Sequence, residues 1–207
     1  MPRTGPDPAR ILIFAKAPVP GQAKTRLIPA LGTAGAAALA ERLLRATVAR
    51  MAAARLAPVD LWCAPDTSHP VFAELAATYD LALHRQQGVD LGERLLNATA
   101  VTLNQAAGAV LIGTDCPQLD AGCLRRALAG LADHDAVLGP AADGGYVLLA
   151  LRAAAPALFA EMPWGGARVA ALTRARMAQL GWRWQELPVL QDLDRPADLV
   201  RLAALAR

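Results

Sequence analysis

The sequence predicts an α/β protein in which helices cover both faces of a mixed, mainly parallel sheet, a three-layer arrangement of the Rossmann-like type. Short apolar runs alternate along the chain with longer segments of helical period. Strands that alternate with helices require crossover connections, which favour parallel pairing. The 207 residues contain neither internal repeats nor an interior linker. We therefore predict one domain over residues 10–207, preceded by a disordered tail, residues 1–9.

Seven short apolar runs are the predicted strands. They lie at residues 11–15, 59–64, 81–84, 109–113, 136–138, 146–151 and 183–187. The run AVLIG at 109–113 is the clearest central strand, because it is wholly apolar and ends sharply at Thr114 and Asp115. The run at 146–151 follows the preceding strand through a short loop, which allows an antiparallel strand and hence a mixed sheet.

Helices are predicted in the segments between and after these strands. They lie at residues 36–56, 71–78, 93–105, 121–131, 156–160, 167–180 and 196–205. In the first of them apolar residues recur on a helical period, while its arginines fall elsewhere on the surface. Asp120 stands directly before the fourth helix and is suited to cap it, because an aspartate there accepts a hydrogen bond from the backbone of the first turn.

Composition argues against several classes of protein. The formal net charge is only +3 and aromatic residues make up 4% of the chain, so we expect no nucleic-acid partner. The three cysteines and three histidines show no CxxC or HxxxH spacing, which argues against a structural zinc site. Without a leader-like segment or an apolar run of about 18 residues, we expect a soluble, cytoplasmic protein with no membrane span. The oligomeric state stays open, since alanine-rich helices pack equally well within and between subunits.

The segment after the first predicted strand is suited to bind an anion. In sheets of this kind ligands bind beyond the carboxyl ends of the strands. The cations, the hydroxyl and the turn glycine of this segment are Lys16, Gly21, Lys24, Thr25 and Arg26. Two prolines and the glycine stiffen the loop, so its cations are placed to converge on phosphate. The alternative is a solvated basic loop; a P-loop is excluded, because Ala23 stands where that motif requires glycine.

Aspartates near two predicted element ends are candidate metal ligands. Asp115 follows the central strand and is placed to bind a hard cation such as Mg²⁺ or Mn²⁺ that bridges phosphates, with Thr114 beside it as a nucleotide contact. The alternative role for Asp115, capping the next helix, suits Asp120 better. Asp192 and Asp194 either begin the last predicted helix or include a second carboxylate for the metal site.

Two glycine-rich segments are further candidate ligand contacts. Asp143 precedes Gly144 and Gly145, which form either an ordinary hairpin turn or a close approach of the backbone to a ligand. The loop at residues 86–92 contains Gly88 and Gly92 and leads into a helix N-terminus. Such a loop either supplies polar contacts to the nucleotide or is a plain turn, and the sequence does not separate the two.

Taken together, these motifs resemble one known family. They are FAKAPVPGQAKTRL at 14–27, QGVDLGERL at 87–95, LIGTDCPQL at 111–119, LGPAADGGYVLLAL at 138–151, PW at 163–164 and DLDRPADL at 192–199. Their order and content are similar to the DUF2064 group of bacterial proteins, over about residues 10–203. That group belongs to the nucleotide-diphospho-sugar transferase superfamily with the GT-A fold. Related branches are 2-phospholactate guanylyltransferase and the molybdenum-cofactor nucleotidyltransferases.

The resemblance implies a role for each motif. The cations Lys16, Lys24 and Arg26 would face the nucleotide phosphates. Asp115 would hold the divalent metal, and Asp194 of the DLD motif would be a second ligand. The residues of the implied acceptor region, with the candidate base first, are Asp143, Gly144, Gly145, Tyr146 and Trp164. After Trp164 the family commonly has Ser-Thr-Asp, whereas this chain has Gly-Gly-Ala at 165–167, which implies a changed or weakened acceptor site.

The sequence is compatible with three functions. The leading hypothesis is a metal-dependent glycosyltransferase with a nucleotide-diphospho-sugar donor and an unknown acceptor. In it the ion at Asp115, with Lys24 and Arg26, would neutralise charge on the diphosphate leaving group. The second is a nucleotidyltransferase, which attacks the α-phosphate of a nucleoside triphosphate and releases pyrophosphate. The third is a non-catalytic nucleotide-binding protein, because likeness of fold does not establish activity.

Overall fold

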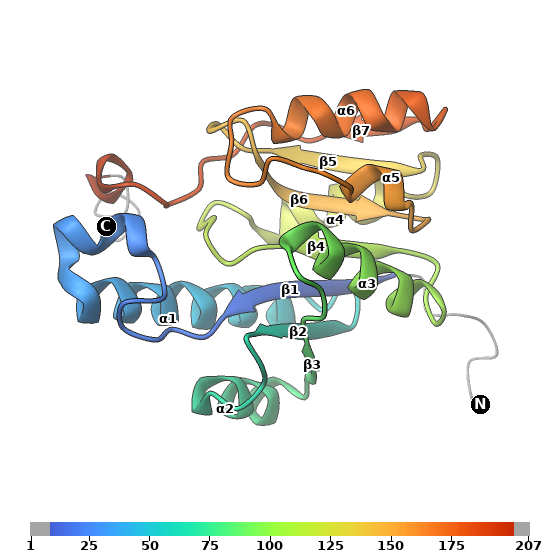
Figure 1. Ribbon diagram of the computed structural model, residues 1–207. Coiled ribbons are helices and arrows are strands. Elements are labelled where there is room, and N and C mark those ends of the chain that lie inside the picture. The colour runs from blue at the N-terminus through green and yellow to red at the C-terminus, as the bar shows by residue number, and fades with distance from the viewer. Residues whose placement is uncertain (1–8, 201–207) are drawn as a thin grey trace.

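The computed structural model describes residues 9–200, which form one seven-stranded sheet with helices on both faces (Figure 1). The strands are β1 (Arg10–Lys16), β2 (Val59–Ala64), β3 (Ala82–Arg85), β4 (Ala109–Ile112), β5 (Ala136–Pro140), β6 (Tyr146–Leu151) and β7 (Trp184–Glu186). Their order across the sheet is β3-β2-β1-β4-β6-β5-β7. The predicted fold class, a three-layer protein with a mixed and mainly parallel sheet, is confirmed.

Strand β1 lies beside β4, the middle strand of the sheet. It pairs in parallel with β2 and β4, so that Ile11 lies opposite Val59 on one side and Val110 on the other. Strand β6 runs antiparallel to both β4 and β5, because the chain turns back directly after β5 without a crossover helix. From β1 the chain builds outward to β2 and β3 and returns to β4 on the other side. The carboxyl ends of β1 and β4 therefore form a topological switch point, where ligands bind in open α/β sheets.

The helices divide between the two faces of this sheet. They are α1 (Ile28–Ala54), α2 (Pro70–Tyr79), α3 (Leu91–Leu103), α4 (Ala121–Gly130), α5 (Pro156–Phe159) and α6 (Val169–Gln179), with short 3-10 turns η1 (Thr25–Leu27) and η2 (Pro196–Asp198). Helices α1, α2 and α4 pack on one face, and α3, α5 and α6 on the other. Asp120 caps α4 as predicted, since its carboxylate accepts a hydrogen bond from the backbone of Cys123 at 2.8 Å.

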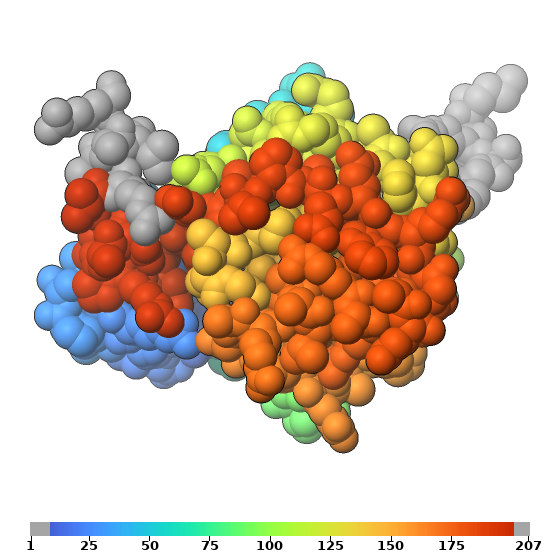
Figure 2. Space-filling view, turned by 90° about the horizontal axis from the view of Figure 1, so that it is seen from above, coloured from blue at the N-terminus to red at the C-terminus, as the bar shows by residue number. Residues whose placement is uncertain are grey.

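Helix α1 begins earlier than its apolar period predicts, at Ile28 instead of residue 36. A kink at Gly32, whose φ is +69°, separates its first turn from the rest. That first turn and Leu27 pack with Leu193 in a small third core cluster. Figure 2 shows the result, with the C-terminal segment (red) lying over the start of α1 (blue). This packing brings residues near 194 beside the loop that follows β1.

Helix α1 also overlaps a segment, Thr25–Ala54, that is long and apolar enough by length and composition to cross a membrane. Its buried residues, among them Leu44 and Val48, belong to the core on one face of the sheet, as in a core helix of a globular protein. Of the predicted tail only Ala9 is described, and it is buried. The predicted last helix begins as the turn η2 and continues as helix at residues 199–200, and its residues from 201 on lie outside the described part of the chain.

Candidate functional site

The loop after β1 folds into a tight turn that carries its cations back toward the sheet. The backbone N–H groups of Gln22 and Ala23 both donate to the carbonyl oxygen of Val19, at 3.0 and 3.1 Å. Ala23 is buried, and Lys24 follows in a left-handed conformation with φ of +47°. The turn therefore directs the side chain of Lys24 inward, while Arg26, two residues later, stays at the surface.

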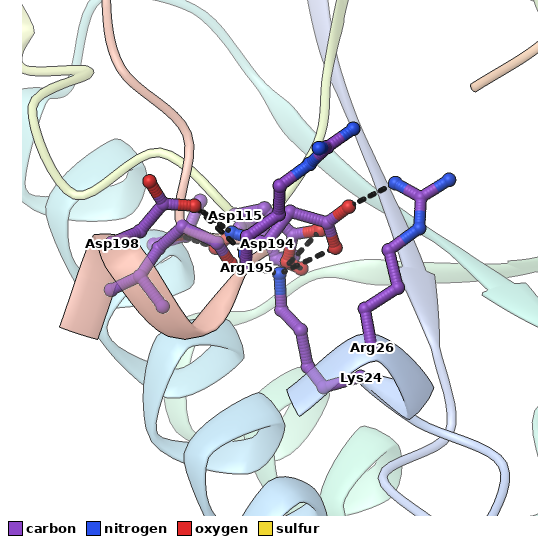
Figure 3. A network of polar contacts seen from close by, with 9 residues as sticks. Lys24, Arg26, Asp115, Asp194, Arg195 and Asp198 are labelled. Atoms are coloured by element: carbon purple, nitrogen blue, oxygen red, sulfur yellow. Dashed lines mark hydrogen bonds and ion pairs between the residues drawn. The ribbon is translucent and has the colours of Figure 1, made fainter. Parts of the chain in front are cut away.

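Lys24 lies between two carboxylates that come from distant parts of the chain (Figure 3). Its Nζ is 2.8 Å from Oδ2 of Asp115, after β4, and 3.7 Å from Oδ1 of Asp194, near the C-terminal end. It also donates to the carbonyl oxygen of Leu193 at 2.5 Å. The side chain of Lys24 is only 5% exposed, whereas that of Asp115 is 47% exposed. The ammonium group is thus held by protein oxygens, and Asp115 keeps an open side.

Arg26 completes this charge network, which consists of Lys24, Arg26, Asp115 and Asp194. Its guanidinium group donates to Oδ2 of Asp194, and its side chain is 51% exposed. The two cations predicted to face phosphates therefore contact the two carboxylates predicted to hold a metal. The structure brings all four predicted residues together, and their binding roles stay predictions.

A turn at the C-terminal segment fixes Asp194 in this position. The carboxylate of Asp198 accepts hydrogen bonds from the backbone N–H groups of Asp194 at 3.1 Å and Arg195 at 2.8 Å. Asp194 does not cap the turn; the capping position of η2 is Arg195. The sequence marked Asp198 only as an acidic residue in the first turn of the last predicted helix. An acidic residue three positions after the start of a turn is also typical of a capping box, which is the role that the structure gives it.

The charge network suits a divalent cation that arrives with a nucleotide. Among residues 9–200 no three Asp, Glu, His or Cys side chains are grouped as a ready-made metal cage. Asp115 and Asp194 nevertheless supply carboxylate oxygens, the ligands that Mg²⁺ and Mn²⁺ prefer. Mg²⁺ is commonly bound through one or two carboxylates and completes its coordination with substrate phosphates and water. The pair therefore fits a nucleotide-bound ion and not a permanent structural metal.

A cavity of about 720 Å³ opens beside the network on the side of β1, β2 and the start of α3. We call it the basic cavity, since its charged and polar lining includes Lys16, Lys24, Thr25, Arg26, Gln86, Arg94 and Thr114. Gln86 donates through Nε2 to the carbonyl oxygens of Ala15 and Trp62, at 3.2 and 2.8 Å, and so ties the ends of β1 and β2 together. The sequence placed Gln86 and Arg94 in the loop before α3, either as polar ligand contacts or as part of an ordinary turn, and the structure brings both residues to this cavity.

Three of the predicted nucleotide contacts, Gly21, Gly88 and Gly92, do not line the basic cavity. Gly88 has φ of +142°, and a Cβ atom there would lie 2.6 Å from Cβ of Glu93. A Cβ at Gly92 would lie 2.7 Å from the carbonyl oxygen of Phe159. Gly88 and Gly92 are therefore explained by the close packing of the loop and of α3 against its neighbours. The structure does not bring these three glycines to the site.

The Asp143–Gly145 segment is a turn between β5 and β6 that packs against a neighbouring loop. Oδ1 of Asp143 accepts a hydrogen bond from the backbone N–H of Gly145 at 2.8 Å. Gly144 has φ of +90°, and a Cβ atom there would lie 2.0 Å from the carbonyl oxygen of Ala167. Its own carbonyl oxygen accepts from the backbone N–H of Ala170 at 2.9 Å. Gly144 thus serves the contact between two loops, while Asp143 stays exposed at the mouth of a second cavity.

This second cavity, of about 310 Å³, lies on the side of β6 and α6. We call it the apolar cavity, because Phe14, Leu91, Leu95, Tyr146, Val147, Trp164 and Val169 line it. The rings of Tyr146 and Trp164 meet edge to face, with centroids 6.3 Å apart. Burial raises the pKa of the Tyr146 phenol, so this hydroxyl stays protonated at neutral pH. The predicted acceptor residues Gly145, Tyr146 and Trp164 therefore share one cavity with Asp143.

The two cavities adjoin, and the charge network lies at their junction. Arg26, Asp115 and Asp194 line both of them, together with Phe14 and Leu91. Of these two cavities, Asp192 lines only the apolar one. Burial raises the pKa of Asp192, and the charge of Asp143 adds to the shift. The sequence indicated Asp192 only as an alternative to Asp194, because spacing does not show which aspartate faces which partner.

Comparison with known proteins gives the family. The family model described as "uncharacterized protein conserved in bacteria", DUF2064, matches residues 47–166. This segment is more than half of the chain and includes Asp115, Asp143 and Trp164. The protein belongs to the DUF2064 family. No curated protein matches it.

Solved structures resemble this DUF2064 protein over nearly its whole length. A protein from Desulfovibrio desulfuricans G20, provisionally assigned as a nucleotide-diphospho-sugar transferase, is 31% identical, with a TM-score of 0.86 over 96% of this chain and 87% of its own. A CMP:2-keto-3-deoxy-manno-octonic acid synthetase complexed with CTP is 12% identical, with a TM-score of 0.59 over 96% and 98%. Glucosyl-3-phosphoglycerate synthase from Mycobacterium tuberculosis, in complex with Mn²⁺, UDP and glucosyl-3-phosphoglycerate, is 13% identical, with a TM-score of 0.57 over 94% of this chain and 75% of its own. The last two similarities establish the fold alone.

Proposed function

We propose that this DUF2064 protein is a metal-dependent glycosyltransferase that uses a nucleotide-diphospho-sugar donor. The observation that supports it most is the pair of adjoining cavities with the charge network at their junction. A group-transfer enzyme has to hold two substrates so that their reacting atoms meet. Here one compartment is basic and the other is apolar, so each suits a different substrate.

The donor is assigned to the basic cavity. Its volume of about 720 Å³ is in the usual range for ligands of nucleotide size. Lys16, Arg94 and the hydroxyl-bearing Thr25 and Thr114 line it, and such groups bind phosphate oxygens. The similar structures that contain CTP or UDP support a nucleotide in this fold.

The metal is assigned to Asp115 and Asp194. A divalent ion bound there would neutralise charge on the diphosphate as it leaves. Lys24 holds the two carboxylates near each other, since its ammonium group contacts both. Arg26, half-exposed at the junction of the cavities, supplies a second positive charge where negative charge builds up in the transition state.

In the proposed reaction an acceptor hydroxyl in the apolar cavity attacks the anomeric carbon of the donor sugar. A new C–O bond forms there, and the bond between the anomeric carbon and the diphosphate oxygen breaks. The nucleoside diphosphate leaves with the electron pair of that bond, and the carboxylate of Asp143 accepts the hydroxyl proton. Asp143 is suited to this role because it lies at the mouth of the apolar cavity.

A nucleotidyltransferase is the second candidate. The likeness to a synthetase that binds CTP favours it. The same cavities would then hold a nucleoside triphosphate, whose α-phosphorus is attacked by the second substrate and whose pyrophosphate leaves. The products separate the two reactions, because glycosyl transfer releases a nucleoside diphosphate and nucleotidyl transfer releases pyrophosphate.

A calorimetric binding panel tests the proposal. The ligands are UDP, GDP, UDP-glucose, GDP-mannose, CTP and GTP, each titrated with and without Mn²⁺. We expect one nucleoside diphosphate or its sugar to bind at least ten-fold more tightly with Mn²⁺. Preference for a triphosphate would replace the glycosyltransferase by the nucleotidyltransferase. A nucleotide that binds but is never turned over would favour the non-catalytic alternative, and absence of binding to every ligand would refute the site.

A further inference from the structure

The apolar cavity is built to receive a hydrocarbon surface. Phe14, Leu95, Tyr146, Trp164 and Val169 line it, and they come from five separate elements or loops of the fold. Leu91, at its entrance, remains 39% exposed. Burial of apolar ligand surface against such a wall is favourable in proportion to the area removed from water. Against the aromatic and aliphatic part of this lining, the hydroxyl groups of a sugar would face carbon atoms, which is unfavourable.

The segment after Trp164 adds no polar side chain to this wall. Gly165 and Gly166 line the cavity without side chains. Ala167 follows, with its backbone in contact with Gly144. No polar side chain from this segment is therefore available to bind hydroxyl groups of an acceptor.

The charged groups of the apolar cavity are nearly all negative. Asp115, Asp143, Asp192 and Asp194 line it, and Arg26 is the single cation of that lining. Arg26 already pairs with Asp194. Without a metal ion, the four carboxylates outnumber Arg26 and Lys24, which contacts two of them. A divalent ion at Asp115 and Asp194 would balance these charges, and the phosphates of a bound donor would make the sum negative again. An anionic acceptor would meet like charges at short range, which opposes its binding.

We propose that the second substrate is an uncharged alcohol with an aromatic or branched aliphatic body. The apolar wall selects the body, and the carboxylates reject acids and phosphate esters. This inference rests on the proposed function for its claim that the occupant is an acceptor. The selectivity of the cavity is a separate property, and it is measurable without turnover.

Three probes that differ in one property each test this selectivity. They are 2-phenylethanol, phenylacetate, which carries the same ring with a carboxylate, and glycerol, which has hydroxyls without an apolar body. Dissociation constants are measured by NMR titration of the full chain. We expect 2-phenylethanol to bind at least ten-fold more tightly than phenylacetate and glycerol. Equal or tighter binding of either competitor would overturn the proposal.

Substitutions then locate the binding. Trp164→Ser removes the aromatic wall and should weaken 2-phenylethanol at least ten-fold, whereas Trp164→Phe should restore most of the affinity. The matched control is Trp182→Ser, since Trp182 packs against the same side of the sheet but does not line the cavity. Equal weakening by both serine variants, with both proteins folded by their melting temperatures, would refute the cavity as the binding place.

A separate test addresses the rejection of anions by the carboxylates. Asp143→Asn should reduce the ratio of the phenylacetate to the 2-phenylethanol dissociation constant several-fold. Asp133→Asn, which changes an exposed aspartate outside the cavity lining, should leave this ratio unchanged. An unchanged ratio in Asp143→Asn would overturn the electrostatic part of the proposal.

The nucleotide-binding panel gives an independent result. If no nucleotide binds while the preference for 2-phenylethanol holds, the transfer reaction fails; if nucleotide binds and the preference is absent, only this further inference fails.

Discussion

The two ends of strand β1 carry cation–carboxylate contacts of similar chemistry and different consequence. At its amino end Arg10 makes a bidentate contact with Asp60 of β2, with distances of 2.8 and 2.6 Å. Asp60 is only 3% exposed. Beyond its carboxyl end Lys24 contacts Asp115 and Asp194, and the side chain of Asp115 is 47% exposed. The carboxylate of the first contact is buried, whereas a carboxylate of the second, that of Asp115, is accessible from a cavity.

The exposure of the carboxylates, and not their charge, distinguishes a structural contact from one that is able to bind a ligand. A buried pair that satisfies its own charges stabilises one register between strands but has nothing left for a ligand. The network at the other end has further aspartates around it, so it retains the capacity to bind a cation. A substitution at the amino end should therefore change the free energy of unfolding, and a substitution at the carboxyl end should change nucleotide binding.

The largest effect is expected at the amino end. Asp60→Asn removes the buried negative charge that Arg10 faces, and breaking a buried pair in this way destabilises proteins by about 3 kcal/mol. We expect the free energy of unfolding in urea to fall by about that amount, with nucleotide binding unchanged. Asp80→Asn is the control, because Asp80 is exposed and its left-handed conformation suits asparagine equally. A loss as large in the control would remove the special role of Asp60.

At the carboxyl end the effect should fall on binding. Asp115→Asn keeps the size of the side chain and removes a charge from the proposed metal pair. We expect Mn²⁺-dependent nucleotide binding to weaken roughly 100-fold, which is about 2.8 kcal/mol. Stability should change less than in Asp60→Asn, because the buried Lys24 keeps Asp194 and the carbonyl oxygen of Leu193 as partners. Calorimetry of the variant beside the wild type measures this.

The matched control for Asp115 follows the same strand. Asp120→Asn also removes one negative charge after β4, but asparagine caps helices as well as aspartate does. Binding should be unchanged in this variant. If nucleotide titrations with Mn²⁺ gave the same curves for Asp115→Asn and the wild type, the metal assignment would be contradicted. The two ends of β1 would then not differ in ligand binding.

The order of elements was accessible from the sequence, because apolar periodicity along the chain reports which segments are buried. The start of α1 was missed, since Ile28 and its neighbours pack against Leu193, and a contact with a residue so far along the chain leaves no local period. The pairing of Lys24 with Asp115 and Asp194 was hidden for the same reason. Local sequence predicted Lys24 and Asp115 as site residues, and the family resemblance added Asp194, but neither revealed that the three residues contact one another.

The glycines illustrate a second limit. Gly88 and Gly144 have positive φ, and a Cβ atom at either would collide with neighbouring atoms. Sequence patterns indicate that such a residue is needed to keep a space free, but they do not say whether a ligand or another part of the chain fills it. At Gly144 the answer is the backbone of Ala167. The position was identified by its sequence, and its role required the structure.

The smallest expected effect tests whether the second aspartate after β4 is purely structural. Asp120→Ala removes the cap of α4 and should lower the free energy of unfolding by about 1 kcal/mol at pH 7. The backbone N–H of Cys123, which donates to the Asp120 carboxylate, lowers the pKa of Asp120 in the folded protein. A carboxyl group with a lowered folded pKa stabilises the protein above its unfolded pKa of about 4. That contribution is lost as the pH falls through the folded pKa.

The difference in unfolding free energy between the wild type and Asp120→Ala should therefore be full at pH 7 and should shrink as the pH falls below about 4. The difference between Asp120→Asn and Asp120→Ala should stay constant over the same range, because an amide does not titrate. Urea unfolding at pH 7, 5 and 3 measures both differences. If Asp120→Ala instead weakened nucleotide binding as Asp115→Asn does, both aspartates after β4 would belong to the site, and the division between a closed structural carboxylate and an open functional one would have to be redrawn within a single loop.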